Sequence, residues 1–211
     1  MLTRTLLGAR TSVIIAAVAT LINSFIGIFY GGIAGYCGGL TDNLMMRWVD
    51  ILSTIPTTLI IIMLMVVIGP GIKTLIIAMG IANWTTMARI VRSQVLSLKE
   101  REFILAAKAA NGNGFWILTK HLIPNAAGSI VVCMTMMVPG AIFSESFLSF
   151  IGLGVSAPNT SWGTLVSDGL TGFRSFPYQL IIPAVSISIT ILALNFVGNG
   201  IQKAINPYEG R

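Results

Sequence analysis

Charged residues are scarce in this sequence. Only 9% of its 211 residues are Asp, Glu, Lys or Arg, whereas an ordinary soluble domain carries about 25%. So few charges cannot cover the surface of a soluble globule. Disorder is excluded as well, because disordered chains combine low hydrophobicity with high charge, and here 55% of the residues are hydrophobic. The composition therefore predicts a polytopic membrane protein.

Histidine and cysteine are also rare, with one histidine, His121, and two cysteines, Cys37 and Cys133. A single histidine excludes a His-based metal cluster or catalytic triad formed within this chain. The cysteines are far apart in sequence and match no zinc-binding or redox spacing. We therefore expect two small buried side chains and no metal site.

The sequence lacks a phosphate-binding P-loop. Its nearest match to G-x-x-x-x-G-K-[ST] is Gly71-Ile72-Lys73-Thr74, which has no glycine directly before the lysine. The chain is therefore predicted not to be an enzyme, and any ATP and Mg²⁺ that drive it must be bound by another polypeptide. No cofactor is expected in this chain.

Long runs without charge are the main positive feature. A membrane-spanning helix needs about 20 apolar residues, and charges bracket five such runs, which predicts an all-α fold and a single transmembrane domain over residues 1–211. The first run is about twice as long as the apolar part of a signal peptide, and its glycines indicate close helix packing. The expected spans are 11–36, 44–68, 72–88, 125–147 and 177–201, with a polar loop at 89–121 and an external segment at 148–176.

The basic residues indicate the orientation, because cytoplasmic loops carry an excess of Lys and Arg. Six of the thirteen lie in the 89–121 loop, so the net charge of +6 gives no reason to expect nucleic acid as a partner. A cytoplasmic position for this loop makes the N-terminus external and the C-terminus cytoplasmic. The nine basic residues then inside are Arg47, Arg89, Arg92, Lys99, Arg101, Lys108, Lys120, Lys203 and Arg211.

Several single residues in the spans stand out. Pro56 and Pro139 each remove a helix hydrogen bond, which produces either a packing bend or a hinge along a translocation path. Glu145, an intramembrane carboxylate near the end of the fourth span, has either a functional role or a structural hydrogen-bonding role, and the structural role is preferred. Arg47 and Asp50 lie three residues apart on one helix and are expected to pair.

The 89–121 loop is predicted to contain two short helices. Ser97 and Glu100 have the capping-box spacing that starts a helix, and good helix formers follow over residues 105–110. One side of this helix is small and apolar, which fits either a helix lying on the bilayer or a docking helix for a cytoplasmic partner. The side chains on this side are Phe103, Ala106, Ala107 and Ala110.

A turn should follow this helix, because Asn111 and Gly112 tolerate the left-handed conformation that ends helices. A second short helix is expected at residues 115–121. Pro124 then stands at a position that favours proline, at the opening of the fourth span.

The same loop resembles the EAA loop of ABC importer permeases, whose form is E-A-A, three residues, Gly, nine residues, I-x-L-P. With the same spacing, Leu105-Ala106-Ala107 stands for E-A-A, Asn111 for the glycine and His121-Leu122-Ile123-Pro124 for I-x-L-P. Four residues depart from the pattern, namely Leu105, Asn111, His121 and Ile123, and Gly112 is then expected to serve the turn. The resemblance implies that the ATPase-docking residues are Phe103, Leu105, Ala106, Ala107, Ala110, Asn111, Gly112 and Pro124.

Other stretches are similar to the dipeptide/oligopeptide/nickel permease family, in particular to its "C"-type subunit. They include Ala34 to Gly39, Arg47 to Asp50, Arg89 to Glu102 and Glu145 to Gly154. The resemblance implies the five-helix core of a type I importer permease with a cytoplasmic EAA coupling helix. Such subunits carry a further helix before the stretch that begins at Gly8, so the sequence as given is expected to be a fragment or a minimal form.

The family resemblance also implies a function. It predicts a multi-pass permease in the cytoplasmic membrane of a prokaryote that imports dipeptides or oligopeptides. The implied partners are a second permease subunit, two cytoplasmic ABC ATPases, an extracellular solute-binding protein and the lipid bilayer. The alternative within the family is import of nickel or another small solute.

Two alternatives lie outside the family. A proton-coupled carrier needs carboxylates or histidines deep in the membrane, and the second, third and fifth spans have none well inside. A membrane assembly subunit would conduct nothing. The aromatic residues of the external segment, Trp162, Phe173 and Phe176, fit either an interfacial aromatic belt or a contact with a delivering protein.

Overall fold

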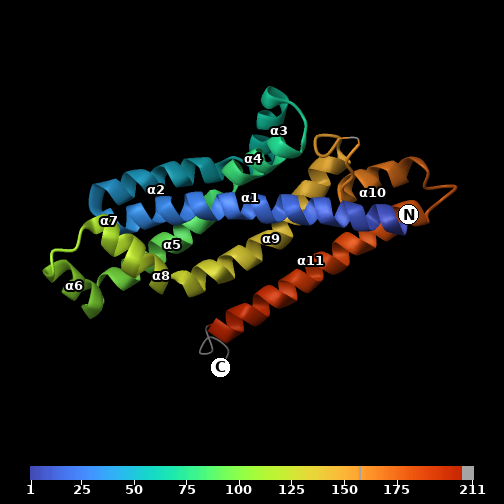
Figure 1. The fold of residues 1–211 in the computed structure, drawn as a ribbon. Coiled ribbons are helices and arrows are strands. Elements are labelled where there is room, and N and C mark those ends of the chain that lie inside the picture. The colour runs from blue at the N-terminus through green and yellow to red at the C-terminus, as the bar shows by residue number, and fades with distance from the viewer. Residues whose placement is uncertain (157, 206–211) are drawn as a thin grey trace.

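The computed structural model describes residues 1–156 and 158–205, and every regular element among them is helical. Long helices run side by side along one axis, and short helices gather near its two ends (Figure 1). The elements are α1 (Leu2–Cys37), α2 (Gly39–Thr54), α3 (Thr57–Ile68), α4 (Ile72–Ala82), α5 (Trp84–Lys99), α6 (Glu102–Ala109), α7 (Gly114–Ile117), the π-helical turn η1 (Leu118–Leu122), α8 (Ile123–Asn125), α9 (Ala127–Phe150), α10 (Trp162–Thr171) and α11 (Tyr178–Ile205).

Four helices are long and apolar enough to cross a membrane, and the number becomes five if one bent helix pair counts as a span. α1, α9 and α11 are three of them, and α4 with α5 forms the fourth over Ile72–Lys99. The third expected span therefore continues through residues 89–99, which were expected to belong to the 89–121 loop. The reason is that residues 84–99 contain no glycine or proline to stop the helix.

The second expected span, at 44–68, is two helices rather than one. α2 and α3 meet at 82°, and Pro56 is the N-cap of α3. Proline keeps the preceding residue out of the helical region, so Ile55 is extended and α2 stops. Pro139, in contrast, lies within α9, which continues through it.

α1 and α5 approach so closely that only glycine fits on α1. Gly27, Gly31 and Gly35 are four residues apart and share one face of the helix. A Cβ atom on Gly31 would lie 2.8 Å from the carbonyl carbon of Ala88, and one on Gly35 would lie 3.0 Å from the carbonyl oxygen of Arg92. This contact confirms the close packing that the glycines predicted.

Two ion pairs join α2 to α5. Arg92 donates two hydrogen bonds to the carboxylate of Asp42, one of them 2.6 Å long, and Arg89 donates to Asp50 at 2.9 Å. The expected pairing of Arg47 with Asp50 is therefore wrong, because an arginine of the neighbouring helix holds that carboxylate.

Single-residue expectations have mixed outcomes. Cys133 is buried in α9 as expected, whereas Cys37 is exposed because it is the last residue of α1. Arg211, which counted among the cytoplasmic basic residues, lies outside the described residues.

At the end of the bundle that holds the N-terminus, α10 packs on α1 (Figure 1). The indole N–H of Trp162 donates to the carbonyl oxygen of Thr5 at 3.1 Å, and its backbone N–H donates to Ser12 Oγ at 3.2 Å. Trp162 is buried, so it is a packing residue and not part of an aromatic belt, whereas Phe173 and Phe176 are exposed.

Candidate functional site

The helix that carries the E-A-A positions, α6, lies at the end of the bundle opposite the N-terminus (Figure 1). It begins at Glu102 with Arg101 as its N-cap. The capping box expected at Ser97 and Glu100 is wrong, because α5 runs on to Lys99 and Ser97 is an exposed residue inside it. The coupling helix is thus shorter than expected and is separated from α5 by a sharp turn.

One face of α6 anchors it to the bundle. Ile104 is fully buried and Ala107 is half-buried, and both pack in an apolar cluster with Val95 of α5 and Ile117 of α7. The remaining side chains of α6 are exposed. Of the four residues expected on the docking face, Phe103, Ala106 and Ala110 are therefore exposed and only Ala107 packs against the chain itself.

The end of α6 has the geometry of a Schellman motif, in which two backbone hydrogen bonds close the helix. The N–H of Gly112 bonds to the carbonyl of Ala107 at 3.1 Å, and the N–H of Asn111 bonds to that of Lys108 at 3.0 Å. Asn111 itself takes the left-handed conformation, with φ at 57°. Asn111 therefore serves the turn at the position where the EAA pattern has glycine, and Gly112 is needed for its close approach to Ala107.

The base of the loop is fixed on the end of α1. Lys99 Nζ donates to the carbonyl oxygen of Tyr36 at 2.6 Å and also lies 5.8 Å from the centre of the Tyr36 ring. A cation at this place complements the negative end of the α1 dipole. On the other side of the loop, a Cβ atom on Gly114 would lie 2.8 Å from the same ring. Both arms of the loop therefore contact Tyr36.

The second arm of the loop contains more helical turns than the sequence suggested. α7 is capped by the side chain of Asn113, and the π-helical turn η1 follows it directly. The rings of Trp116 and His121 lie 4.6 Å apart in this region. Pro124 lies in the first turn of α8, and the long helix of the fourth span begins at Ala127.

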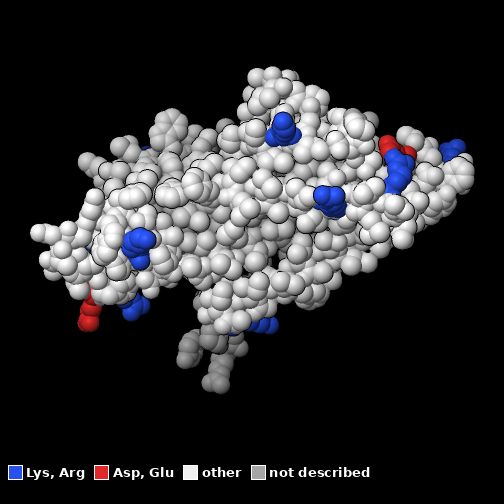
Figure 2. All heavy atoms as spheres, in the orientation of Figure 1, with Lys and Arg blue, Asp and Glu red and all other residues white. Residues whose placement is uncertain are grey.

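The two arms present an apolar surface at this end of the molecule. Phe103, Leu105, Phe115 and Trp116 are between 41% and 65% exposed. Charged side chains are sparse on the face shown in Figure 2, and both basic and acidic side chains lie at the end that carries α6. Exposed apolar groups set among charges mark a protein or membrane contact.

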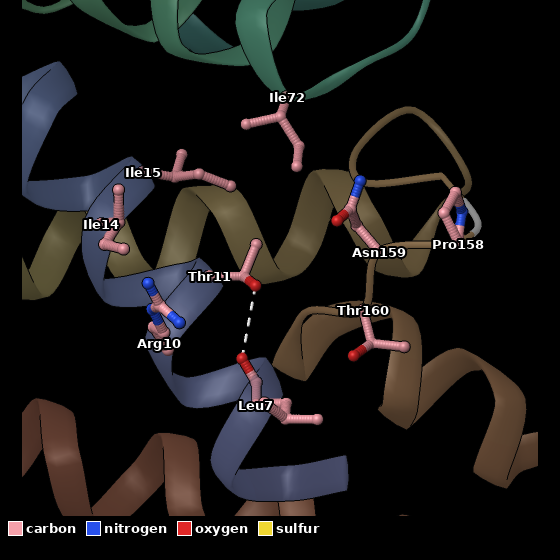
Figure 3. Close-up of a pocket in the computed structure, with 9 residues that line it drawn as sticks. All are labelled: Leu7, Arg10, Thr11, Ile14, Ile15, Ile72, Pro158, Asn159 and Thr160. Atoms are coloured by element: carbon pink, nitrogen blue, oxygen red, sulfur yellow. Dashed lines mark hydrogen bonds between the residues drawn. The ribbon is translucent and has the colours of Figure 1, made fainter.

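A groove of about 380 Å³ lies near the opposite end of the bundle. Figure 3 shows it bounded by the outer turns of α1, the start of α4 and the segment that precedes α10. Its walls mix apolar side chains with one cation and neutral polar groups. The lining residues are Leu7, Arg10, Thr11, Ile14, Ile15, Ile72, Pro158, Asn159 and Thr160.

Glu145 lies in the last third of α9 and is fully buried. Its carboxylate accepts hydrogen bonds from Ser149 Oγ at 2.7 Å and from Ser146 Oγ at 3.4 Å. Ser149 Oγ in turn accepts from the backbone N–H of Val155, beyond the end of the helix. The carboxylate is thus part of a network that ties α9 to the following segment.

A comparison with known families gives the class of the protein. The family described as "Binding-protein-dependent transport system inner membrane component" matches residues 27–208. The chain belongs to this family. Relatives of the chain are named as permease proteins of transport systems.

Curated relatives of this inner membrane component cover nearly all of it. The oligopeptide transport system permease protein OppC of Bacillus subtilis is 49% identical over 97% of this chain and 67% of its own length. The dipeptide transport system permease protein DppC of the same organism is 48% identical, over 97% and 64%. DppC of Lactococcus lactis is 44% identical, over 97% and 60%. The chain therefore spans about 60 to 67% of the length of these relatives.

Solved structures share the fold of this inner membrane component. A chain of the MetNI methionine ABC transporter in an inward-facing conformation matches with a TM-score of 0.74 and 18% identity, over 97% of both chains. A chain of an amino acid ABC transporter crystallised with histidines matches with a TM-score of 0.69 and 12% identity, over 96% and 94%. These similarities confirm the type I importer permease fold.

Sequence reasoning missed two features of this family member. α10 was not expected as a helix, although Ser161 and Thr164 form a reciprocal capping box at its start, and a serine before such a run is a usable signal. The break at Asn83, between α4 and α5, is stabilised by a side chain of α1 and has no local signature beyond its polar neighbours.

Proposed function

We propose that this chain is the transmembrane permease subunit of an ATP-driven, binding-protein-dependent importer of peptides. The observation that carries the proposal is α6, a short helix anchored by one face at Ile104 and Ala107 and exposed on the rest, at the position and spacing of the EAA loop. Peptide as the solute is supported by the curated relatives, which are named for oligopeptide and dipeptide transport.

In this proposal one cytoplasmic ATPase binds the exposed face of α6. A second ATPase binds the corresponding helix of the second permease subunit. The inner face of α6 packs with Val95 of α5, and α5 is in backbone contact with α1 at Gly31. A displacement of α6 is therefore passed to two long helices as a rigid unit, because closely packed elements shift together. ATP and Mg²⁺ belong to the ATPases in this scheme, and this chain supplies the pathway.

The orientation follows from the same proposal. α6 and the C-terminus lie on the cytoplasmic side, and the N-terminus lies on the external side with α10. The groove near Arg10 and Asn159 then opens outward, where an extracellular solute-binding protein would deliver the solute. Its mixture of one cation and neutral polar groups suits contact with a polar rim of such a protein.

The experiment is reconstitution of the chain in proteoliposomes with a permease of the other type in the pair, candidate ATPases and the binding protein. We expect ATP hydrolysis and uptake to be stimulated by a dipeptide or a longer peptide and not by a nickel complex. Stimulation by nickel alone would replace peptide with the metal as solute. Peptide uptake driven by a proton gradient without ATPase subunits would contradict the proposal altogether.

A further inference from the structure

A cavity of about 220 Å³, with a wall of both polar and apolar side chains, lies between α1, α9 and the junction of α4 with α5. At this junction Asn83 is outside helical geometry, and its backbone N–H donates to Asn23 Oδ1 of α1 at 3.2 Å. The long helix is thus interrupted about half-way along its length. Within a membrane, interrupted helices are tolerated where they line a cavity or are buried in protein.

The cavity has polar groups that the chain itself does not satisfy. Thr20 lines it, is 2% exposed, and its buried hydroxyl has no hydrogen-bond partner among the described residues. The side-chain amide of Asn83 and the hydroxyls of Thr86 and Ser144 also line the cavity, and no hydrogen bond within the described part of the chain engages them. A buried polar group without a partner costs free energy, and this applies to the Thr20 hydroxyl. The other three groups are half-buried or exposed and therefore accessible, so the arrangement points to a ligand.

The cavity opens on the surface of the bundle at Thr86 and Gly140, which are exposed. A Cβ atom on Gly140 would meet no atom within 4 Å. A polar opening at this depth is unfavourable against lipid, which places it against a water-filled pathway or a second protein. The volume is below the usual range for a whole ligand, about 300 to 1,000 Å³, so the cavity takes a fragment of a larger solute.

The polar lining groups are neutral amides and hydroxyls that both donate and accept hydrogen bonds, and Met136, Met137 and Ala141 form the apolar part of the wall. A peptide group is likewise neutral and offers one donor and one acceptor at every residue. Metal ions instead favour carboxylate, imidazole or thiolate ligands. The chemistry of the cavity therefore matches the main chain of a peptide, whatever its side chains.

Building on the proposed import of peptides, we propose that the cavity at the α4–α5 junction binds a main-chain amide of the solute during its passage. Thr20, Asn83, Thr86 and Ser144 supply the hydrogen bonds. The rest of the solute contacts the second permease subunit. Because recognition is of the main chain, this site contributes affinity without selecting sequence.

The test uses the reconstituted complete importer and two variants of this chain. Thr86→Val combined with Ser144→Ala removes two hydroxyls without charge and with little change of shape. Thr135→Val is the matched control, since the Thr135 hydroxyl lies on the same helix as Ser144 but donates to the backbone carbonyl of Val132. We expect the double variant to lower peptide uptake about tenfold, which is about threefold for each hydrogen bond lost, and the control to keep wild-type uptake.

A second measurement separates a lost contact from general damage. Uptake of a peptide is compared with uptake of its analogue in which one amide is an ester, both at saturating loaded binding protein. The wild type should prefer the amide, and the double variant should lose this preference. An unchanged preference in the double variant, or equal loss in Thr135→Val, overturns the proposal. If the wild-type importer takes up no peptide at all, the proposed function fails instead.

Discussion

The contact between α1 and α5 allows a quantitative prediction for Gly31→Ala. Alanine has a higher helix propensity than glycine by about 1 kcal/mol, so the substitution would stabilise an isolated helix. In the structure, however, the added Cβ would lie 2.8 Å from the carbonyl carbon of Ala88 and 2.9 Å from its Cα, whereas ordinary contacts begin near 3.4 Å. The clashing atoms are backbone, so no rotamer change relieves them and the helices must separate.

Overpacking of this kind costs about 1 to 3 kcal/mol. We expect the upper part of this range at Gly31, which leaves a net loss of about 2 kcal/mol after the gain in propensity. The measurement is unfolding of the detergent-solubilised protein in SDS, followed by circular dichroism. Gly200→Ala in α11 is the matched control, because its Cβ would meet nothing within 4 Å, and it should cost nothing. A Gly31→Ala protein as stable as the wild type would refute the close backbone contact.

Two further predictions concern the end of α6 and the ion pair between α2 and α5. Asn111→Gly should stabilise the end of α6 by about 1 kcal/mol or less, because a left-handed conformation costs an L-residue about 1 to 2 kcal/mol and asparagine less. Slower hydrogen exchange at residues 110–112 would show this stabilisation, and faster exchange would contradict it. Arg92→Ala should destabilise the protein by about 2 kcal/mol, because it leaves the buried Asp42 carboxylate without its partner. The control is Arg4→Ala. Both partners of the Arg4–Asp168 ion pair are exposed, so this pair should contribute less than about 1 kcal/mol. Equal effects of the two substitutions in the same SDS titration would contradict the greater contribution of the Arg92–Asp42 pair.

The candidate membrane-spanning helices were predictable because the signal for them, an apolar run, is local in the sequence. A largely apolar run such as residues 125–147, in which Glu145 is the single charged residue, is favoured in the membrane over most of its length, and α9 is found there. The turn after α6 was predictable for a similar reason, since asparagine and glycine favour the left-handed conformation wherever they occur. Family resemblance added a prediction that composition could not supply, namely that the 89–121 loop couples to a partner.

The features that the sequence did not predict depend on contacts between residues that are far apart in the sequence. Asp50 could pair with Arg47 by helical spacing, but the bend near Pro56 and the extension of α5 bring Arg89 to it instead. Trp162 carries no sign of being buried until α10 is known to pack on Thr5 of α1. At the break at Asn83, Asn23 of α1 accepts the hydrogen bond of the freed backbone N–H. In each case the deciding partner is more than 35 residues away in the sequence.

The exposed face of α6 is the centre of the functional account, and Ala106→Glu tests it most directly. Ala106 is exposed and points away from the anchoring face, so the variant should still insert and fold. Ala204→Glu is the matched control, since Ala204 is also an exposed alanine, near the end of α11. The account predicts that Ala106→Glu lowers co-purification of the ATPase and ATP-driven peptide uptake at least tenfold, about 1.4 kcal/mol, while Ala204→Glu keeps both. Wild-type co-purification and uptake with Ala106→Glu would contradict it.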